Sequence, residues 1–478
     1  MLDVKTDPQP AEKLIGGVEG RCVTELPIWL RALDAGAVTL LLVGFSVFFT
    51  GGFRIATLIG HLSVRSWPRP VAIAVATLVV RHLLWQQPSI VSRLGGLIDR
   101  WRRSEDVRVV RPLVISTRLG VLAVGFLGIV LLGYAPHTPP YRVYENDFLN
   151  MPARWDTGWF VGIAREGYQF DPSAREKMQN VAFFPLYPML MRYGSLVAGG
   201  HVLWVGVAVS LSSFFWSAIL LYRLARKHLG DDAAAAGVAF LATYPFALFY
   251  STAYTEGLYL LTVVAACYHF ERDELWKAAA WGFAAGLTRP NGCLLSVVLA
   301  LMTIQRWRTV KSLPLAPRIA VVAAPGVAML CFSAYMYFLT GNALQWATQH
   351  AAWGRVYRGF DAVIAEQFQH ARQGFYEYAS SRPLDMLHAG VVVLMVSSVV
   401  PVYRLFGAPY AAMIALNILP PLAIGGLLSM GRVSSVVFPT FLWLGSAVPV
   451  RHRAAWLIGF AMLQGLCAIA FFTWRPLY

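Results

Sequence analysis

The sequence predicts an all-α protein that crosses a membrane many times, with about 11–13 transmembrane helices. Three observations lead to this fold class. Of the 478 residues, 57% are hydrophobic and only 14% are charged, whereas soluble domains carry about 25% charged residues. Apolar runs of about 20 residues, the length that spans a bilayer, recur along the chain. Basic residues cluster between these runs, as in cytoplasmic loops.

The charged residues are mostly basic, with 40 Lys and Arg against 25 Asp and Glu and a net charge of +15. In a soluble protein this balance would point to nucleic acid. Here it predicts membrane topology and no nucleic-acid partner, because the basic residues lie in short segments between apolar runs. The composition excludes a disordered chain. Five cysteines without a CxxC pair argue against a metal site or a disulfide framework.

Most apolar runs are long enough, or nearly so, to form spans. They are 29–50, 70–86, 113–134, 201–222, 233–250, 256–271, 317–340, 386–405, 408–429, 433–450 and 453–473. A further stretch, 277–305, is interrupted by Thr288–Gly292 and predicts two short helices that dip toward one point.

The basic loops set the predicted orientation. Placing them all in the cytoplasm puts the N-terminus inside and the C-terminus outside. These loops are 91–112, 223–228, 306–318 and 451–453. Polar residues suited to chemistry then collect in five segments on the non-cytoplasmic side, which predicts a single site there. The five segments are the long loops 135–200 and 341–385, the short loops 251–256 and 430–432, and the break at 288–292.

Residues 1–112 are predicted to be an N-terminal extension of a main domain at 113–478. The first 28 residues are polar and lack the apolar core of a signal peptide. The two apolar runs within 29–86 either span the membrane or lie along its interface. Between them, a glycine pair and an alternation of polar and apolar residues predict a small β-hairpin in 51–69.

Asp156 begins a predicted helix in the first long loop. From Trp155 to Ala164 the apolar residues recur at helical spacing, which indicates a short amphipathic helix lying on the bilayer. Asp is a strong helix N-cap, so capping is one interpretation. The other is a general base. Between Trp155 and Trp159 the carboxylate would be partly desolvated, which raises a carboxyl pKa toward values useful for proton abstraction.

Three further charged residues lie at the outer ends of apolar runs. Glu256 is either an acidic first-turn residue or functional, because a carboxylate at the rim of a span needs a partner. Arg289 lies at a helix break. One interpretation is a structural Arg–Glu pair. The other is an anion site, to which the helix N-terminus after Asn291 would contribute. Arg432 is either an anchor at the membrane interface or a phosphate ligand.

The second long loop carries Trp346, His350 and Trp353 at i, i+4 and i+7, on one face of a predicted helix. Tryptophan with polar side chains is typical of a sugar-binding platform. It is equally typical of an aromatic belt at the membrane interface.

Together these motifs resemble the PIG-V-like mannosyltransferases, bacterial relatives of glycosylphosphatidylinositol mannosyltransferase II in glycosyltransferase family 76. The specific part is Arg154-Trp155-Asp156 followed by Ala182-Phe183-Phe184-Pro185. Tyr254-Thr255-Glu256, the Thr288–Gly292 break, the segment Gly341–Arg355 and Gly431-Arg432 then follow in the family's order. The resemblance covers about residues 113–473. Two departures are His350, where the family motif has Gln, and residues 1–112, which have no counterpart in the eukaryotic enzyme.

The resemblance implies a GT-C glycosyltransferase fold in the bacterial plasma membrane, with its site on the non-cytoplasmic face. It implies a polyprenyl-phosphate-mannose donor and transfer with inversion to a glycan, glycolipid or protein acceptor. Asp156 matches the catalytic aspartate. The residues expected to bind donor or acceptor are Arg154, Trp155, Phe184, Tyr187, Glu256, Arg289, Asn291, Trp346, His350, Trp353, Arg355 and Arg432.

The residues are consistent with this chemistry. Inverting transfer needs one base for the acceptor hydroxyl, here Asp156, and arginines such as Arg289 or Arg432 can clamp the departing phosphate. No cofactor is required. A divalent metal is compatible with the fold, although no dense carboxylate cluster demands one. Alternatives are a related enzyme that uses another polyprenyl-phosphate sugar or glycosylates protein, and a lipid-linked-sugar transporter. A transporter would suit a broken helix, but the chain has one such break and no internal repeat.

Overall fold

The structure is a computed structural model that describes residues 27–50, 52–57, 60–64, 66–85, 90–138, 141–309, 315–381 and 384–477. Apart from one hairpin and an isolated bridge, the regular structure in these ranges is helical, which confirms the all-α prediction. The chain divides into two compact units, Met1–Gly96 and Leu97–Tyr478. Helix α4 (Glu105–Leu132) lies wholly in the second unit and runs through residue 112.

The first unit contains two apolar helices joined by a hairpin. Helix α1 (Ile28–Thr50) packs against α2 (Pro68–Leu84). Strands β1 (Phe53–Thr57) and β2 (Gly60–Val64) pair antiparallel between them, so the predicted hairpin is confirmed. Arg81 of α2 donates through Nε to Asp34 Oδ1 of α1 at 3.0 Å, and both side chains are buried. Each charge is therefore compensated inside the helix pair.

Six helices in the described residues are long and apolar enough to cross a membrane. The bent pair α8 (Asp231–Thr243) and η3 (Pro245–Ser251), with 79° between its parts, raises this to seven if it is one span. The six are α1, α4, α7 (Val202–Leu229), α12 (Leu315–Thr340), α16 (Asp385–Phe406) and α20 (Val450–Phe472). A multi-pass membrane protein is confirmed, with fewer full-length spans than the 11–13 expected.

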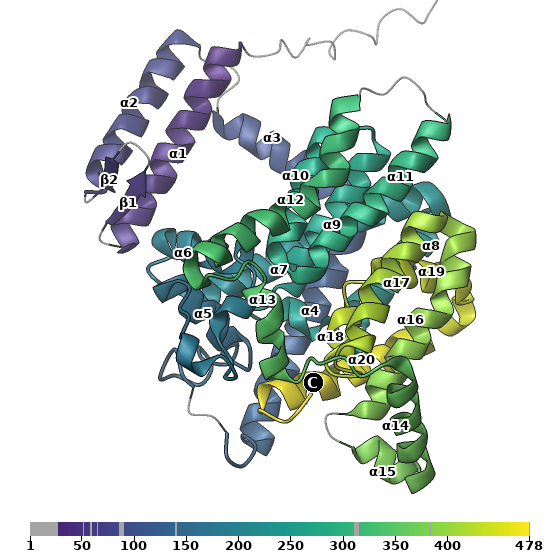
Figure 1. Ribbon diagram of the computed structural model, residues 1–478. Helices are drawn as coiled ribbons and strands as arrows, with labels where there is room; N and C mark the ends of the chain where they lie inside the picture. Colours follow the sequence, from purple (N-terminus) through teal and green to yellow (C-terminus); the bar gives the residue numbers. More distant parts are fainter. Residues whose placement is uncertain are drawn as a thin grey trace, which may run out of the picture. The chain divides into compact units, whose positions relative to one another are not determined.

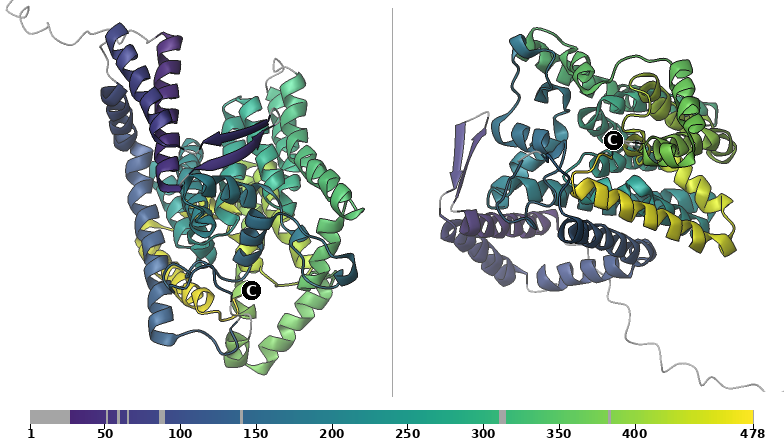
Figure 2. Two further views of the ribbon diagram at one scale, coloured as in Figure 1. Left: turned by 90° about the vertical axis from the view of Figure 1, so that its left-hand side faces the viewer. Right: turned by 90° about the horizontal axis from the view of Figure 1, so that it is seen from below.

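In the larger unit, the remaining apolar runs form helices of 10–16 residues, because breaks and prolines interrupt them. They are α9 (Glu256–Glu271), α10 (Leu275–Thr288), α11 (Leu295–Thr309), α17 (Ala408–Ala423) and α19 (Phe438–Ala447). Helices α7, α9, α10 and α12 lie side by side in the larger unit (Figure 1), and α20 packs along α4 (Figure 2). Every residue of α9 from Glu256 to Cys267 is buried, so α9 is a core helix.

Short helices at the ends of these long ones build the surroundings of the site. The first long loop contains α5 (Thr157–Glu166), η1 (Pro172–Ala174), η2 (Asn180–Ala182) and α6 (Leu186–Val197). The second contains α13 (Gln345–Thr348), η5 (Gln349–Trp353), α14 (Phe360–Gln373) and α15 (Phe375–Ser380). Helix α18 (Met430–Ser434) precedes α19. Apart from these, α3 (Ile90–Arg103) precedes α4 in the chain and carries none of the predicted site residues.

Helix α5 corrects one expectation. Its apolar face, with Phe160, Val161 and Ala164, packs into a cluster with Tyr187 and Leu203 of α6 and α7. Helical periodicity reveals an apolar face but not whether lipid or protein covers it. Here protein covers it, so this face does not lie on the bilayer.

A buried arginine stabilises the bend between α8 and η3. Arg118 of α4 donates to the carbonyl oxygens of Ala242 and Ala247 and to Ser251 Oγ. Its guanidinium also lies 5.0 Å from the ring centroid of Phe214. Because a helix end leaves backbone carbonyls without helical partners, these bonds, together with those from Gln464 Nε2 to the carbonyls of Ala242 and Tyr244, supply donors at the bend.

Candidate active site

Four charged residues from distant parts of the sequence form one chain of ion pairs. Arg432 of α18 donates through Nη1 to Asp156 Oδ2 at 2.5 Å. Its Nε lies 3.0 Å from Glu256 Oε1. Arg289 donates through Nη1 to the same Glu256 oxygen at 3.0 Å. Asp156, Arg432 and Arg289 keep 17%, 13% and 11% of their side chains exposed, whereas Glu256 is fully buried.

Asp156 occupies the N-cap position of α5, but its side chain makes no capping hydrogen bond. Instead its backbone N–H donates to Tyr254 Oη at 3.0 Å. The preceding residue, Trp155, has a φ of +51°, a left-handed conformation that is uncommon away from glycine. This turn and the tyrosine orient the backbone while the carboxylate points to Arg432, so capping does not occupy it.

Glu256 and Arg289 meet because α9 begins close to the point where α10 ends. Glu256 is the first residue of α9, and Arg289 follows α10 with an extended backbone. Glu256 Oε2 has no hydrogen-bond partner among the described residues. Gly292 permits the break after Arg289 to approach α10, since a Cβ there would lie 2.0 Å from the carbonyl oxygen of Ala285. The Arg289–Glu256 pair that the break predicted as one interpretation is thus present, with Arg432 added to it.

A cavity of about 410 Å³ opens beside this chain of charges. Three arginines line it: Arg289, Arg432 and, from the second long loop, Arg355. Burial, with the positive charges of Arg355 and Arg432, lowers the pKa of His350 to about 4, so this imidazole is neutral at pH 7. The lining residues are Phe160, Ala182, Phe183, Phe184, Thr255, Thr288, Arg289, Pro290, Asn291, Cys293, Leu294, Trp346, Ala347, His350, Arg355, Pro420, Pro421, Ile424, Arg432 and Val433.

The aromatic side chains of the two long loops meet at this cavity. Trp346 donates through Nε1 to Ser333 Oγ at 2.9 Å, and its ring packs edge-on against Phe184. Trp353 packs edge-on against Phe183. The predicted helix through Trp346, His350 and Trp353 is divided in two, since its second half, η5, is a 3-10 helix.

Five predicted binding residues do not line the cavity. Two of them, Glu256 and Trp353, contact residues that do, Arg432 and Phe183. Arg154 is buried and donates to the carbonyls of Phe472, Asn150 and Ala153 and to Tyr134 Oη. Trp155 packs against Trp474. Tyr187 is fully buried and donates to the carbonyl oxygen of Gly206. These bonds and packing contacts tie the loop to the helices, so the structure gives these side chains supporting positions.

His388 is a residue that the sequence did not single out. It is fully buried in α16, and its Nδ1 accepts from the Gly431 N–H at 2.9 Å, next to Arg432. Its Nε2 lies 2.9 Å from the Leu477 carbonyl oxygen. His388 therefore fixes the start of α18. Because His388 lies inside an apolar run, the sequence does not indicate that it contacts the start of α18.

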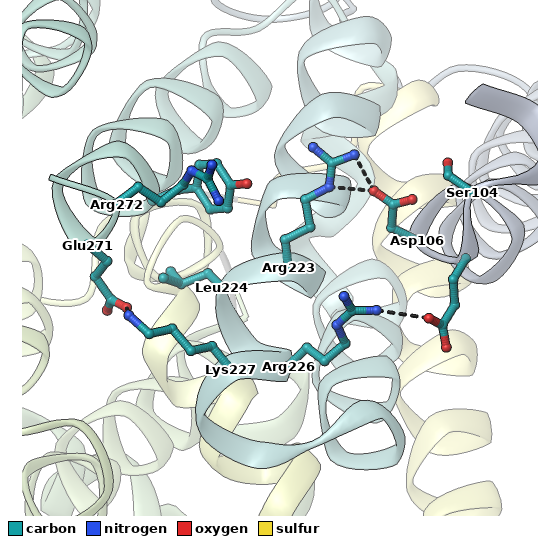
Figure 3. A pocket seen from close by; sticks show the side chains of 10 residues that line it. Ser104, Asp106, Arg223, Leu224, Arg226, Lys227, Glu271 and Arg272 are labelled. Atoms are coloured by element: carbon teal, nitrogen blue, oxygen red, sulfur yellow. Dashed lines mark hydrogen bonds and ion pairs between the residues drawn. The ribbon is translucent and has the colours of Figure 1, made fainter. Parts of the chain in front are cut away.

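A larger cavity, of about 610 Å³, lies among the basic loops. Arg223 pairs there with Asp106, Arg226 with Glu105 and Lys227 with Glu271 (Figure 3). Arg272 lies over the ring of Tyr268, 5.5 Å from its centroid. Size alone would favour this cavity as the site. Its arginines and its lysine all have partners, so it is better explained as an ion-pair network that joins α4, α7 and α9.

Comparison with known proteins connects the geometry to a family. Residues 138–340 match the family described as mannosyltransferase (PIG-V), which confirms the resemblance seen in the motifs. No curated protein matches the chain. The match and the apolar helices support a membrane glycosyltransferase.

Among solved structures, the chain is similar to archaeal oligosaccharyltransferase AglB from Archaeoglobus fulgidus, in complex with an inhibitory peptide and a dolichol-phosphate. The identity is 12% and the TM-score 0.40, over 77% of this chain and 56% of that one. The oligosaccharyltransferase of the same organism, in complex with zinc and sulfate, gives 12% and 0.39 over 76% and 53%. The chain thus spans about half the length of these proteins.

Proposed function

We propose that this chain, whose residues 138–340 match the PIG-V mannosyltransferases, transfers mannose from polyprenyl-phosphate-mannose to an acceptor hydroxyl with inversion, on the non-cytoplasmic face of the membrane. The observation that carries the proposal is the Asp156 carboxylate. It is not used as a helix cap and is held by Arg432, which itself lines a cavity with two further arginines.

In the proposed reaction the acceptor oxygen attacks the anomeric carbon of mannose while the bond from that carbon to the phosphate oxygen breaks. Asp156 takes the proton of the acceptor hydroxyl. The polyprenyl phosphate leaves with the bonding electrons, and because phosphate is a good leaving group, no second carboxyl group has to protonate it. Arg432 orients the base through the 2.5 Å contact, and Arg289 and Arg432 stabilise the charge that develops on the phosphate.

Glu256 has a different role from Asp156 in this proposal. It is fully buried and contacts two arginines, so it holds both guanidinium groups at the edge of the cavity. A buried carboxylate between two cations is a poor candidate for taking a substrate proton. The aromatic side chains of Phe183, Phe184 and Trp346 on the cavity wall offer surfaces to a sugar ring or to the first isoprene units.

The test uses the purified full chain in nanodiscs with radiolabelled polyprenyl-phosphate-mannose and envelope lipid or glycan extracts as acceptors, with and without EDTA. Mannose should appear in a product with inverted configuration, and Asp156→Asn should abolish it. Asp147→Asn is the matched control, since Asp147 lies in the same loop and forms a half-exposed pair with Arg142.

The same experiment separates the alternatives. Polyprenyl-phosphate arabinose is offered in parallel, and transfer of arabinose alone would reject mannose as the substrate. A transporter would move the labelled lipid across a vesicle bilayer and give no glycosylated product.

A further inference from the structure

The cavity holds one arginine without a carboxylate partner. Among the described residues, no Asp or Glu oxygen lies within 4.0 Å of the Arg355 guanidinium, and its side chain makes no hydrogen bond there. Arg289 and Arg432 differ, because Glu256 and Asp156 already compensate them. Arg355 is therefore the cation most ready to accept an anion from outside the protein.

The backbone holds Arg355 firmly in place. Gly354, with a φ of +73°, ends η5 in the left-handed conformation. The next residues then pair with the chain after α17: Gly425 N–H donates to the Val356 carbonyl and Arg358 N–H to the Ala423 carbonyl, both at 2.9 Å. Gly425 lies against the Arg355 stem, 3.6 Å from Cγ at the position a Cβ would take, and its φ of +101° is one that favours glycine. This short antiparallel contact fixes where the guanidinium enters the cavity.

The charges at the cavity leave an excess of one. Three arginines, Arg289, Arg355 and Arg432, face two carboxylates, Asp156 and Glu256. Burial, and then the positive charges of Arg432 and Arg289, lower the pKa of Arg355 to about 10. An anion of single charge would balance the site.

We infer that Arg355 binds the phosphoryl oxygen of a lipid phosphodiester and makes the site selective for a sugar carried on one phosphate over a sugar carried on a diphosphate. The inference rests on the proposed function. A polyprenyl-phosphate sugar is a diester with one negative charge, which equals the excess in the cavity, whereas a diphosphate carrier brings a second charge that has no partner. Arg289 and Arg432 then act on the charge that develops as the phosphate departs, and Arg355 binds the charge present from the start.

The experiment measures binding without catalysis. Purified full chain in detergent is titrated with farnesyl methyl phosphate as the diester probe. Farnesyl diphosphate, farnesol and inorganic phosphate are titrated in parallel, with tryptophan fluorescence as readout because Trp346 lines the cavity. Wild type should bind the diester at least tenfold more tightly than farnesol, diphosphate or free phosphate.

The preference is the Kd for farnesol divided by the Kd for the diester. Arg355→Gln should reduce this ratio to about one, and Arg355→Lys should retain part of the preference. Arg358→Gln is the matched control, since Arg358 lies three residues on, pairs with Glu366 and does not line the cavity. Its preference should equal that of wild type. If Arg355→Gln does not fold, Arg355→Lys decides: an unchanged preference together with an unchanged KM for the donor overturns the inference.

Other outcomes are equally decisive. Equal affinity for diester and farnesol in wild type overturns the inference, as does tighter binding of diphosphate or of inorganic phosphate. If mannose is transferred but Arg355→Gln keeps the wild-type preference, the inference fails and the proposed function stands. If the preference depends on Arg355 but no mannose is transferred, the phosphodiester site stands and the proposed reaction fails.

Discussion

Arg432 donates to the carboxylate of Asp156 at 2.5 Å although 276 positions separate the two residues in the sequence. The contact joins the first long loop to the short helix α18, and Glu256 holds the other side of the same guanidinium. A carboxylate oriented in this way keeps its second oxygen for a substrate. The relationship gives Asp156 both a fixed direction and an adjacent positive charge.

Asp156→Asn removes the proposed base and keeps the shape. We expect the turnover number to fall by about 10²- to 10⁴-fold, the usual contribution of a general base, with a small change in donor KM. Radiolabel transfer by purified protein measures both constants, and Asp147→Asn should remain close to wild type. Turnover of Asp156→Asn within twofold of wild type would contradict the assignment.

Glu256→Gln removes the negative charge that compensates two buried arginines. Loss of one partner from a buried ion pair costs about 3–5 kcal/mol, so the thermal unfolding midpoint in detergent should fall clearly. Glu105→Gln is a suitable control, because Glu105 is a half-exposed carboxylate that pairs with Arg226. An unchanged midpoint would show that Arg289 and Arg432 do not depend on Glu256.

Much of the fold could be predicted from the sequence. Apolar length, the basic loops and the helix break at Arg289 all depend on local composition, which a sequence displays directly. The hairpin in 53–64 follows from local alternation in the same way. The position of Asp156 at the start of a helix was also visible, because capping residues and helical spacing are local signals.

The pairing of the site residues could not be predicted in the same way. Whether Arg432 reaches Asp156 or lipid depends on how α18 packs, and His388 fixes that helix from inside an apolar run. Arg154 lies two residues before Asp156 in the sequence, yet its side chain turns to the carbonyls of Phe472 and Asn150. Nearby residues on a turn point in different directions, so a shared motif does not imply a shared role.

Arg118 should prove essential for stability. Arg118→Met keeps most of the side-chain volume but removes this donor from the Ala247 carbonyl and leaves the Ala242 carbonyl with Gln464 Nε2 as its remaining side-chain donor. An unsatisfied buried polar group costs about 1–3 kcal/mol, so the expected loss is of that order. Arg111→Met is the control, since Arg111 is exposed on the same helix. Thermal unfolding in detergent measures both, and equal midpoints for the two variants would refute the role.

His350 should make stability depend on pH. Its pKa is about 4 in the folded protein, lowered from an ordinary value of 6.5 by burial and by neighbouring arginines. As pH falls below 6.5, the unfolded chain takes up a proton that folded His350 does not, so the folded state loses stability down to about pH 4. Below that value both states are protonated and the loss stops growing.

The comparison of wild type with His350→Gln isolates this residue from the carboxylates that titrate in the same range. Unfolding midpoints are measured from pH 8 to pH 4.5 for both proteins. The difference between them should stay constant above about pH 7 and should shift in favour of the variant as pH falls, because glutamine takes up no proton. Two curves that remain parallel over the whole range would mean that His350 titrates in the folded protein as it does in the unfolded chain, and that the three arginines of the cavity do not act on it.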